Sequence, residues 1–294
     1  MKPTTVQQPA PAPLVVHDVT VKFAGLTALD RVSFEVAPRT IHALIGPNGA
    51  GKSTCFNVLT GVYRASSGTI RLGEELLSGK RPHTIAALGI ARTFQNLALS
   101  PHQTVRENLM VARHRLMRAG LLATGLGLPR ARREQRAHRA RVEELAELMG
   151  IAGLLNAPAG LLAYGDQKRI ELTRALCLEP RLLLLDEPVA GMNADETHTM
   201  ARQISALRDE LGISVLLVEH DMGMVMRIAD QVTVLDFGRR IASGPPDLVR
   251  ADPAVIGAYL GTGREETDAA GPVLDDLNPV EAPPALDDDK EWSR

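Results

Sequence analysis

Aromatic residues are scarce in this chain of 294 residues: they make up 3% of the sequence, with a single tryptophan. A hydrophobic core must therefore be built mainly from Leu, Val, Ile and Ala. There are two cysteines, Cys55 and Cys177, and a chain this long can bury its own core without a disulfide framework. We expect both to be small, buried apolar residues.

Long hydrophobic runs and a charge excess are missing too. No apolar run reaches the length of a membrane-spanning helix, because the longest, around Leu182–Leu185, has the length of a strand. Residues 1–13 lack the apolar segment of a signal peptide, so we expect a soluble chain that can still dock on a membrane protein. The net charge of −2 gives no argument for nucleic acid, and we expect no such partner.

The two ends of the chain differ in composition from the rest. Residues 1–13 are rich in Pro and Gln, and residues 262–294 contain ten acidic and three basic residues with few large apolar ones. Such segments cannot bury enough surface to offset chain entropy, so we expect a disordered leader and a disordered acidic tail. A docking role for the tail is the alternative. Residues 14–261 then form the folded domain.

Strand and helix patterns alternate through residues 14–261. The alternation in 32–36 predicts a half-buried antiparallel strand and, with strand patterns in 14–23, an N-terminal antiparallel β-subdomain. Residues 104–180 show helix signals and no convincing strand, which predicts an inserted α-helical subdomain. Continuous apolar strands alternating with helices indicate an α/β fold with a parallel sheet covered on both faces. Those strands are expected at 41–45, 182–185, 214–218 and 231–235.

One motif carries specific chemistry, a glycine-rich loop between a strand and a helix that matches G-x-x-x-x-G-K-[ST]. Its residues are Gly46, Pro47, Asn48, Gly49, Ala50, Gly51, Lys52, Ser53 and Thr54. The curled backbone points successive amides at phosphate oxygens, and the helix N-terminus favours negative charge. Lys52 can reach the β- and γ-phosphates, and the Ser53 hydroxyl can bind Mg²⁺. The sequence therefore predicts a P-loop NTPase core that binds ATP with Mg²⁺.

A pair of carboxylates follows the apolar strand 182–185. Asp186 stands where a parallel strand ends, a position from which it can hold the Mg²⁺ shell. Glu187 follows and can orient or deprotonate an attacking water. Without the glycine-rich loop, a solvent-exposed strand end would explain both residues.

Further segments resemble the nucleotide-binding subunit of ATP-binding cassette (ABC) transporters, from about Leu14 to Gly261. The segment 162–167, Leu-Ala-Tyr-Gly-Asp-Gln, occupies the position of the family's signature motif. The others are Gln95 in Arg-Thr-Phe-Gln-Asn, residues 190–193 and His220.

The resemblance implies a role for each matching residue. Phe23 would stack on adenine, although a lone aromatic on a strand is more often part of a core. Gln95 would sense Mg²⁺ and the attacking water, Glu187 would be the general base, and His220 would contact the γ-phosphate. The signature segment, with Ala163 and Gly165, would face ATP bound by a second ATPase subunit.

The signature segment departs from the family's most common sequence, Leu-Ser-Gly-Gly-Gln. Ala163 replaces the serine, Tyr164 the first glycine and Asp166 the glutamine. Gly165 and the backbone amides remain, so most of the electrostatic contribution should survive. We expect Asp166 to point away from the phosphate and cap the following helix.

The branch of the family is indicated by four stretches. They are 23–29, 91–96, 219–226 and 255–261, and they resemble the larger ATPase subunit of branched-chain amino-acid importers. The resemblance implies a peripheral protein on the cytoplasmic face of the inner membrane. Its partners would be two transmembrane permease subunits, a second ATPase subunit in a head-to-tail dimer and, indirectly, a periplasmic binding protein.

Other readings stay open. Urea and amide importers and lipopolysaccharide exporters use similar subunits. A soluble ABC ATPase of DNA repair or translation is disfavoured by the single cassette and the absence of sustained heptads. A non-catalytic cassette is disfavoured because every hydrolytic position is filled.

The stretch 113–141 holds nine arginines and one acid, Glu134. We expect these arginines to face anionic head groups or the permease, and a solvated helical surface is the alternative.

Overall fold

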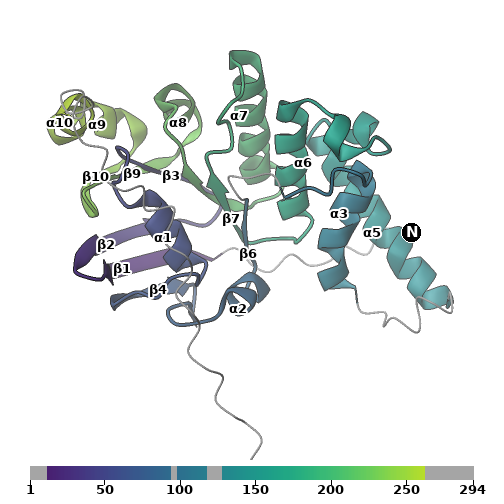
Figure 1. The fold of residues 1–294 in the computed structure, drawn as a ribbon, viewed down its shortest axis with the longest axis horizontal. Helices are drawn as coiled ribbons and strands as arrows, with labels where there is room; N and C mark the ends of the chain where they lie inside the picture. Colours follow the sequence, from purple (N-terminus) through teal and green to yellow (C-terminus); the bar gives the residue numbers. More distant parts are fainter. Residues whose placement is uncertain (1–11, 94–97, 118–127, 262–294) are drawn as a thin grey trace, which may run out of the picture.

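The computed structural model describes residues 12–93, 98–117 and 128–261. Residues 1–11 of the expected leader, Gln95 and the tail 262–294 therefore lie outside the described residues. Two sheets form the framework, and helices flank the larger one (Figure 1). The boundaries proposed for the helical subdomain, 104–180, stay a prediction.

The central sheet has six strands in the order β10-β9-β3-β8-β7-β6. All neighbours are parallel except the hairpin of β9 and β10, as expected for apolar strands joined by helices. The strands are β3 (Ile41–Ile45), β6 (Ile90–Arg92), β7 (Leu182–Asp186), β8 (Ser214–Val218), β9 (Gln231–Asp236) and β10 (Arg239–Gly244). The expected strands are confirmed.

The N-terminal sheet is antiparallel and has the order β2-β1-β4-β5. Its strands are β1 (Leu14–Phe23), β2 (Leu26–Val36), β4 (Ser67–Leu72) and β5 (Glu75–Leu76). The antiparallel strand expected at 32–36 is the second half of β2. Side chains of β1, β2 and β4 pack against one face of the central sheet.

The helices complete two cores, one on each face of the central sheet. Alternate residues of β7 face opposite ways, because Leu182 and Leu184 join one core while Leu183 and Leu185 join the other. The core with the N-terminal sheet includes α1 (Lys52–Leu59) and α2 (Pro82–Ala87). The opposite core includes α3 (Val105–Arg113), α5 (Pro129–Leu148), α6 (Tyr164–Leu176), α7 (Ala194–Asp209), α8 (Met222–Ile228), α9 (Pro246–Ala251) and α10 (Pro253–Gly261).

Short 3₁₀ helices, His114–Leu116, Ala152–Leu154 and Ala159–Leu161, link the helices of this region. Cys55 and Cys177 are buried free thiols, one in each core, and burial raises the pKa of each to about 12. Among the described residues, no helix has the length and apolar character to cross a membrane.

Candidate nucleotide-binding site

The glycine-rich loop lies between the buried strand β3 and helix α1. Gly46 and Gly51 have φ values of 151° and 98°, conformations that L side chains rarely adopt. A Cβ on Gly46 would stand 2.1 Å from the carbonyl oxygen of Leu235, and one on Gly51 would stand 2.7 Å from that of Ala28. The loop can therefore curl at these points only because no side chain is present.

Lys52 closes the loop on itself. Its Nζ donates to the carbonyl oxygens of Gly46 at 2.7 Å and Pro47 at 2.8 Å. Burial lowers the pKa of Lys52, and the nearby carboxylates of Glu187 and Asp186 oppose that shift. The ammonium group is thus held at the mouth of the loop, within the field of both acids.

The register of the central sheet brings the loop and the carboxylates to one edge. Leu44 of β3 pairs with Val218 of β8, and Val218 pairs with Asp186 of β7. Because these strands are parallel, their carboxyl ends leave the sheet together. Glu187 follows in the left-handed region with φ of 47°, and its amide donates to the carbonyl of Val218 at 2.9 Å.

Asp186 is held by Arg92, a contact that its place at the end of a strand does not predict. Its Oδ2 accepts from Nη2 of Arg92 at 2.7 Å, and the two side chains are 11% and 13% exposed. Nη1 of Arg92 donates to Oδ1 of Asn57 in α1 at 2.7 Å. Arg92 therefore ties Asp186 to the helix that begins with Lys52. A charged residue ending the apolar strand 90–92 is the sequence signal for this contact.

Glu219 and His220 follow β8, the strand between β3 and β7. The Glu219 side chain is buried and accepts from the amides of Val189, His220 and Asp221 at 3.0, 3.0 and 3.3 Å. Burial raises the pKa of Glu219, and these amides oppose the rise. His220 is 67% exposed, with Nδ1 3.7 Å from Glu219. It is thus free to meet a ligand above the sheet edge.

Phe23 stands at the end of β1 and is half-buried rather than part of the core. Its ring meets the edge of Tyr63 with ring centroids 5.1 Å apart and an angle of 74° between the planes. The amide of Tyr63 donates to the carbonyl of Asn57 in α1 at 3.1 Å. The segment after the phosphate loop thus supports the ring that is expected to stack on adenine.

The signature segment begins helix α6, with Ala163 at the N-cap. No side chain caps this helix, so the expected capping role of Asp166 is wrong. Asp166 stands in the first turn and pairs with Arg169 one turn later, which satisfies its carboxylate within the helix. Gly165 packs against the Glu196 carboxylate of α7, since a Cβ there would stand 2.5 Å from Oε1.

The phosphate loop and the signature segment are not brought together in one chain. Helix α1 packs in the core on one face of the central sheet, and α6 packs in the core on the other. Figure 1 shows the two helices on different sides of β7. Among the described residues, no hydrogen bond or ion pair joins 163–165 to 46–54.

The residues present fit a nucleoside triphosphate with a divalent cation. The loop provides amides and an ammonium group for phosphates, while the Ser53 hydroxyl and Asp186 carboxylate are hard oxygen donors. In the described ranges, no cluster of three His, Cys, Asp or Glu residues could hold a metal alone. A cation here would need phosphate oxygens as ligands, which is how Mg²⁺ usually binds nucleotides. The fold and the site define a P-loop nucleoside triphosphatase.

Comparison with known proteins identifies the family. Residues 29–190 match the family described as ABC transporter, and residues 239–265 match one described as branched-chain amino acid ATP-binding cassette transporter. The chain belongs to the ABC transporter family of ATP-binding proteins, and it is an ATPase.

Relatives match over almost their whole length. The chain is 44% identical to the high-affinity branched-chain amino acid transport ATP-binding protein LivG of Salmonella typhimurium, over 84% of this chain and 97% of that protein. It is 43% identical to BraF of Pseudomonas aeruginosa, a protein of the same description, with the same coverage. The crystal structure of the ADP conformation of an ABC transporter cassette has a TM-score of 0.74 at 29% identity, over 86% of this chain and all of that one. These likenesses confirm the ABC ATPase fold.

Proposed function

We propose that this chain is the ATP-hydrolysing subunit of an importer for branched-chain or related amino acids. The observation that carries the proposal is the pairing of Leu44 with Val218 and of Val218 with Asp186 across three parallel strands. This pairing puts the phosphate loop and the Asp186–Glu187 pair at the same carboxyl edge of the sheet. Relatives with 43–44% identity over 97% of their length are described as branched-chain amino acid transport ATP-binding proteins, which supports the solute class.

The phosphate loop binds the triphosphate. Backbone N–H groups of residues 46–54, other than Pro47, and the N-terminus of α1 contact its oxygens, and Lys52 exchanges the carbonyls of Gly46 and Pro47 for the β- and γ-phosphates. Ser53 and Asp186, with Gln95 outside the described residues, would hold Mg²⁺. When bound, Mg²⁺ neutralises the charge that develops on the phosphates. Phe23 stacks on adenine.

Glu187 acts on water, and His220 contacts the γ-phosphate. The left-handed backbone at Glu187, fixed by its amide bond to Val218, lets the carboxylate leave the sheet beside Asp186. His220 follows β8, the neighbouring strand, with its ring exposed. A base from one strand and a phosphate ligand from the next can then position an in-line attack.

The site is completed by a second ATPase subunit. Since α1 and α6 lie on opposite faces of the sheet, the amides near Ala163 and Gly165 serve ATP bound by the partner. Closure of the two subunits over two ATP moves a pair of permease subunits, and hydrolysis resets them. The chain is then peripheral on the cytoplasmic face of the inner membrane, and a periplasmic binding protein delivers the solute.

Replacing Glu187 by Gln tests the hydrolytic role. The amide cannot accept a proton, so E187Q should bind ATP, accumulate as a closed dimer and lose more than about a hundredfold in turnover. Turnover, nucleotide affinity and dimer mass measure these outcomes. The control is E74Q, which removes an exposed carboxylate and should keep wild-type turnover. Undiminished hydrolysis by E187Q would show that another group is the base.

The solute class needs a separate experiment. The chain is reconstituted with its permease and binding-protein partners in vesicles, and uptake of leucine, isoleucine and valine is compared with uptake of urea, amides and other amino acids. ATP-driven uptake of urea or an amide, with none of the branched-chain amino acids, would overturn the solute class and leave the ATPase role standing.

A further inference from the structure

Helix α5 carries its charges in the order opposite to the one that stabilises a helix. Arg130, Arg132 and Arg133 stand in its first two turns, and Glu143, Glu144 and Glu147 stand in its last two. The helix dipole favours acids at the N-terminus and bases at the C-terminus, so both ends oppose it. A sequence that breaks a local rule in this way points to a role for the charges outside the helix.

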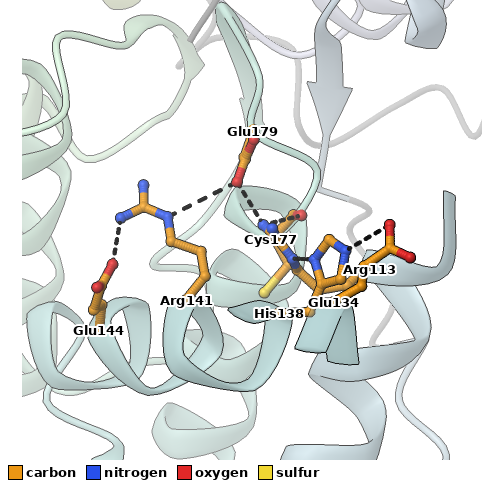
Figure 2. Close-up of polar contacts among 7 residues, drawn as sticks. All are labelled: Arg113, Glu134, His138, Arg141, Glu144, Cys177 and Glu179. Atoms are coloured by element: carbon orange, nitrogen blue, oxygen red, sulfur yellow. Dashed lines mark hydrogen bonds and ion pairs between the residues drawn. The ribbon is translucent and has the colours of Figure 1, made fainter. Parts of the chain in front are cut away.

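Two nearby arginines are already used inside the protein. Arg113 of α3 is 2% exposed and donates to Nδ1 of His138 at 2.9 Å and to Oε1 of Glu179 at 2.7 Å (Figure 2). Arg141 donates to Glu144 at 2.9 Å, and its Nε lies 3.9 Å from Glu179. These contacts fix α5 to α3 and to the link between α6 and β7.

Five arginines of α5 remain on the outside. They are Arg130, Arg132, Arg133, Arg136 and Arg139, all of them exposed. No hydrogen bond or ion pair joins any of them to another described residue. Successive residues of a helix are rotated by about 100° around its axis. The side chains of the last four arginines in this list therefore leave the axis of α5 within an arc of about 120°, which is centred away from the buried Val142 and Leu145. We call these five residues the arginine face.

We propose that the arginine face binds the head groups of anionic phospholipids beside the permease. The proposal rests on the proposed function only in placing the chain next to a membrane. Guanidinium groups form bidentate contacts with phosphate, and the positive end of the helix dipole adds to their field. Figure 1 places α5 at the side of the molecule opposite α9 and α10.

A lipid surface fits this face better than a protein does. Protein interfaces depend on buried aromatic anchors surrounded by mixed polar residues. Helix α5 has no Phe, Tyr or Trp, and the exposed charged residues of its N-terminal half are all arginines, with Glu134 half-buried. A charged membrane needs no complementary shape, because each basic residue near its surface contributes almost independently.

Binding to vesicles tests the proposal. The full-length protein is sedimented with vesicles of phosphatidylcholine alone and of phosphatidylcholine mixed with phosphatidylglycerol. It should bind the mixed vesicles more tightly, and the difference should shrink as salt is added. The triple variant R132Q/R133Q/R136Q should bind them about a hundredfold more weakly, since each arginine contributes roughly fivefold.

The control removes the same charge elsewhere. The variant R81Q/R202Q/R250Q lacks three exposed arginines of other elements and should bind as the wild type does. Equal losses in both triple variants, or unchanged binding of the first, would overturn the proposal. A first variant that keeps its vesicle binding but fails to assemble with the permease in neutral lipid would assign the face to a protein instead.

The ATPase turnover of the soluble protein separates this proposal from the proposed function. Neither triple variant touches the nucleotide site, so turnover and melting temperature should match the wild type. Loss of vesicle binding with normal turnover supports the lipid contact, whatever solute the transporter carries.

Discussion

Arg92 joins three parts of the nucleotide site through one guanidinium group. It pairs with Asp186 at the end of β7, bonds Asn57 of α1, and lies 5.5 Å from the centre of the Phe56 ring. The pair is almost buried, so removing the cation leaves a carboxylate with little water to replace it. We expect R92Q to lower the free energy of unfolding by about 3 kcal/mol.

Urea denaturation measures this loss, and a double-mutant cycle with D186N assigns it to the pair. The double variant should be more stable than the sum of the single losses predicts. The exposed pair of Arg239 and Asp30, at 2.7 Å, gives the control, and R239Q should change stability little. Additive losses in the cycle would show that Arg92 acts through Asn57 or Phe56 instead.

Residues of the site differ in how far the sequence could predict them. Lys52 and Ser53 were predictable because the loop fixes their positions within a few residues of local sequence. Arg92 and Tyr63 gained their contacts from strand order and the packing of α1, which one sequence does not specify. The role of Asp166 could not be predicted, because an acid in a first turn can either cap the helix or pair with a base one turn on.

Among the elements, the start of α6 is coupled to the start of α7 through Gly165 and Glu196. Glu196 closes a capping box with Asn193, and its carboxylate fills the space where a side chain on Gly165 would stand. A methyl group at 165 should push the carboxylate away and open the box. G165A should therefore lower the free energy of unfolding by about 1 kcal/mol more in the wild type than in an E196A background.

Thermal or urea unfolding of the four proteins measures that difference. G153A is the matched control, because nothing lies within 4 Å of its added Cβ, and it should behave alike in both backgrounds. An equal effect of G165A with and without Glu196 would mean that the two helices are not coupled by this contact.

Strand β3 buries a histidine whose protonation the folded state resists. His42 bonds Oγ1 of Thr233 at 2.9 Å, and burial lowers its pKa from 6.5 to about 4. The unfolded chain binds this proton more readily, so stability is complete above pH 6.5 and falls as pH drops toward 4. The loss should reach about 3 kcal/mol.

Urea denaturation across pH 4 to 7 measures this effect, and H42Q serves as the reference because its side chain does not titrate. Glu219, whose pKa is raised, changes stability in the opposite direction over part of this range. Because Glu219 is present in both proteins, subtracting the H42Q profile from the wild-type profile isolates the contribution of His42. Parallel profiles for wild type and H42Q would contradict the assignment.

The strands buried on both faces were predicted nearly to the residue. β7 and β8 are uninterrupted apolar runs, the pattern of a central parallel strand. β4 has four exposed residues out of six, and β6 has three residues in all, so neither carries a pattern strong enough to detect. Their positions follow from pairing with β1 and β7, which are distant in the sequence.

At the scale of the whole molecule, each of the two cores supports one of the two segments expected to contact ATP. The core with the N-terminal sheet supports the phosphate loop, and the opposite core supports the signature helix α6. Any shift of the helical region relative to the central sheet therefore moves the signature segment and leaves the loop in place. The contacts that resist this shift are then expected to control how the subunit closes.

The network around Arg113 is the polar part of that resistance. Arg113 connects α3 to His138 of α5 and, through Glu179 and the carbonyl of Cys177, to the link between α6 and β7 (Figure 2). Burial and the Arg113 charge lower the pKa of His138, so the neutral ring can accept the hydrogen bond that Nε of Arg113 donates. R113M should keep most of the side-chain volume at position 113 but remove the cation nearest to Glu179. The Glu179 side chain is only 9% exposed, so water can replace that cation poorly.

We expect R113M to loosen the helical region without unfolding the sheet. Hydrogen exchange followed by mass spectrometry should show faster exchange in α3 and α5, with β3 and β8 as protected as in the wild type. R139M, on the exposed side of α5, is the control and should exchange like the wild type. Uniformly faster exchange in R113M would show that the network stabilises the whole fold and does not set the position of the signature helix.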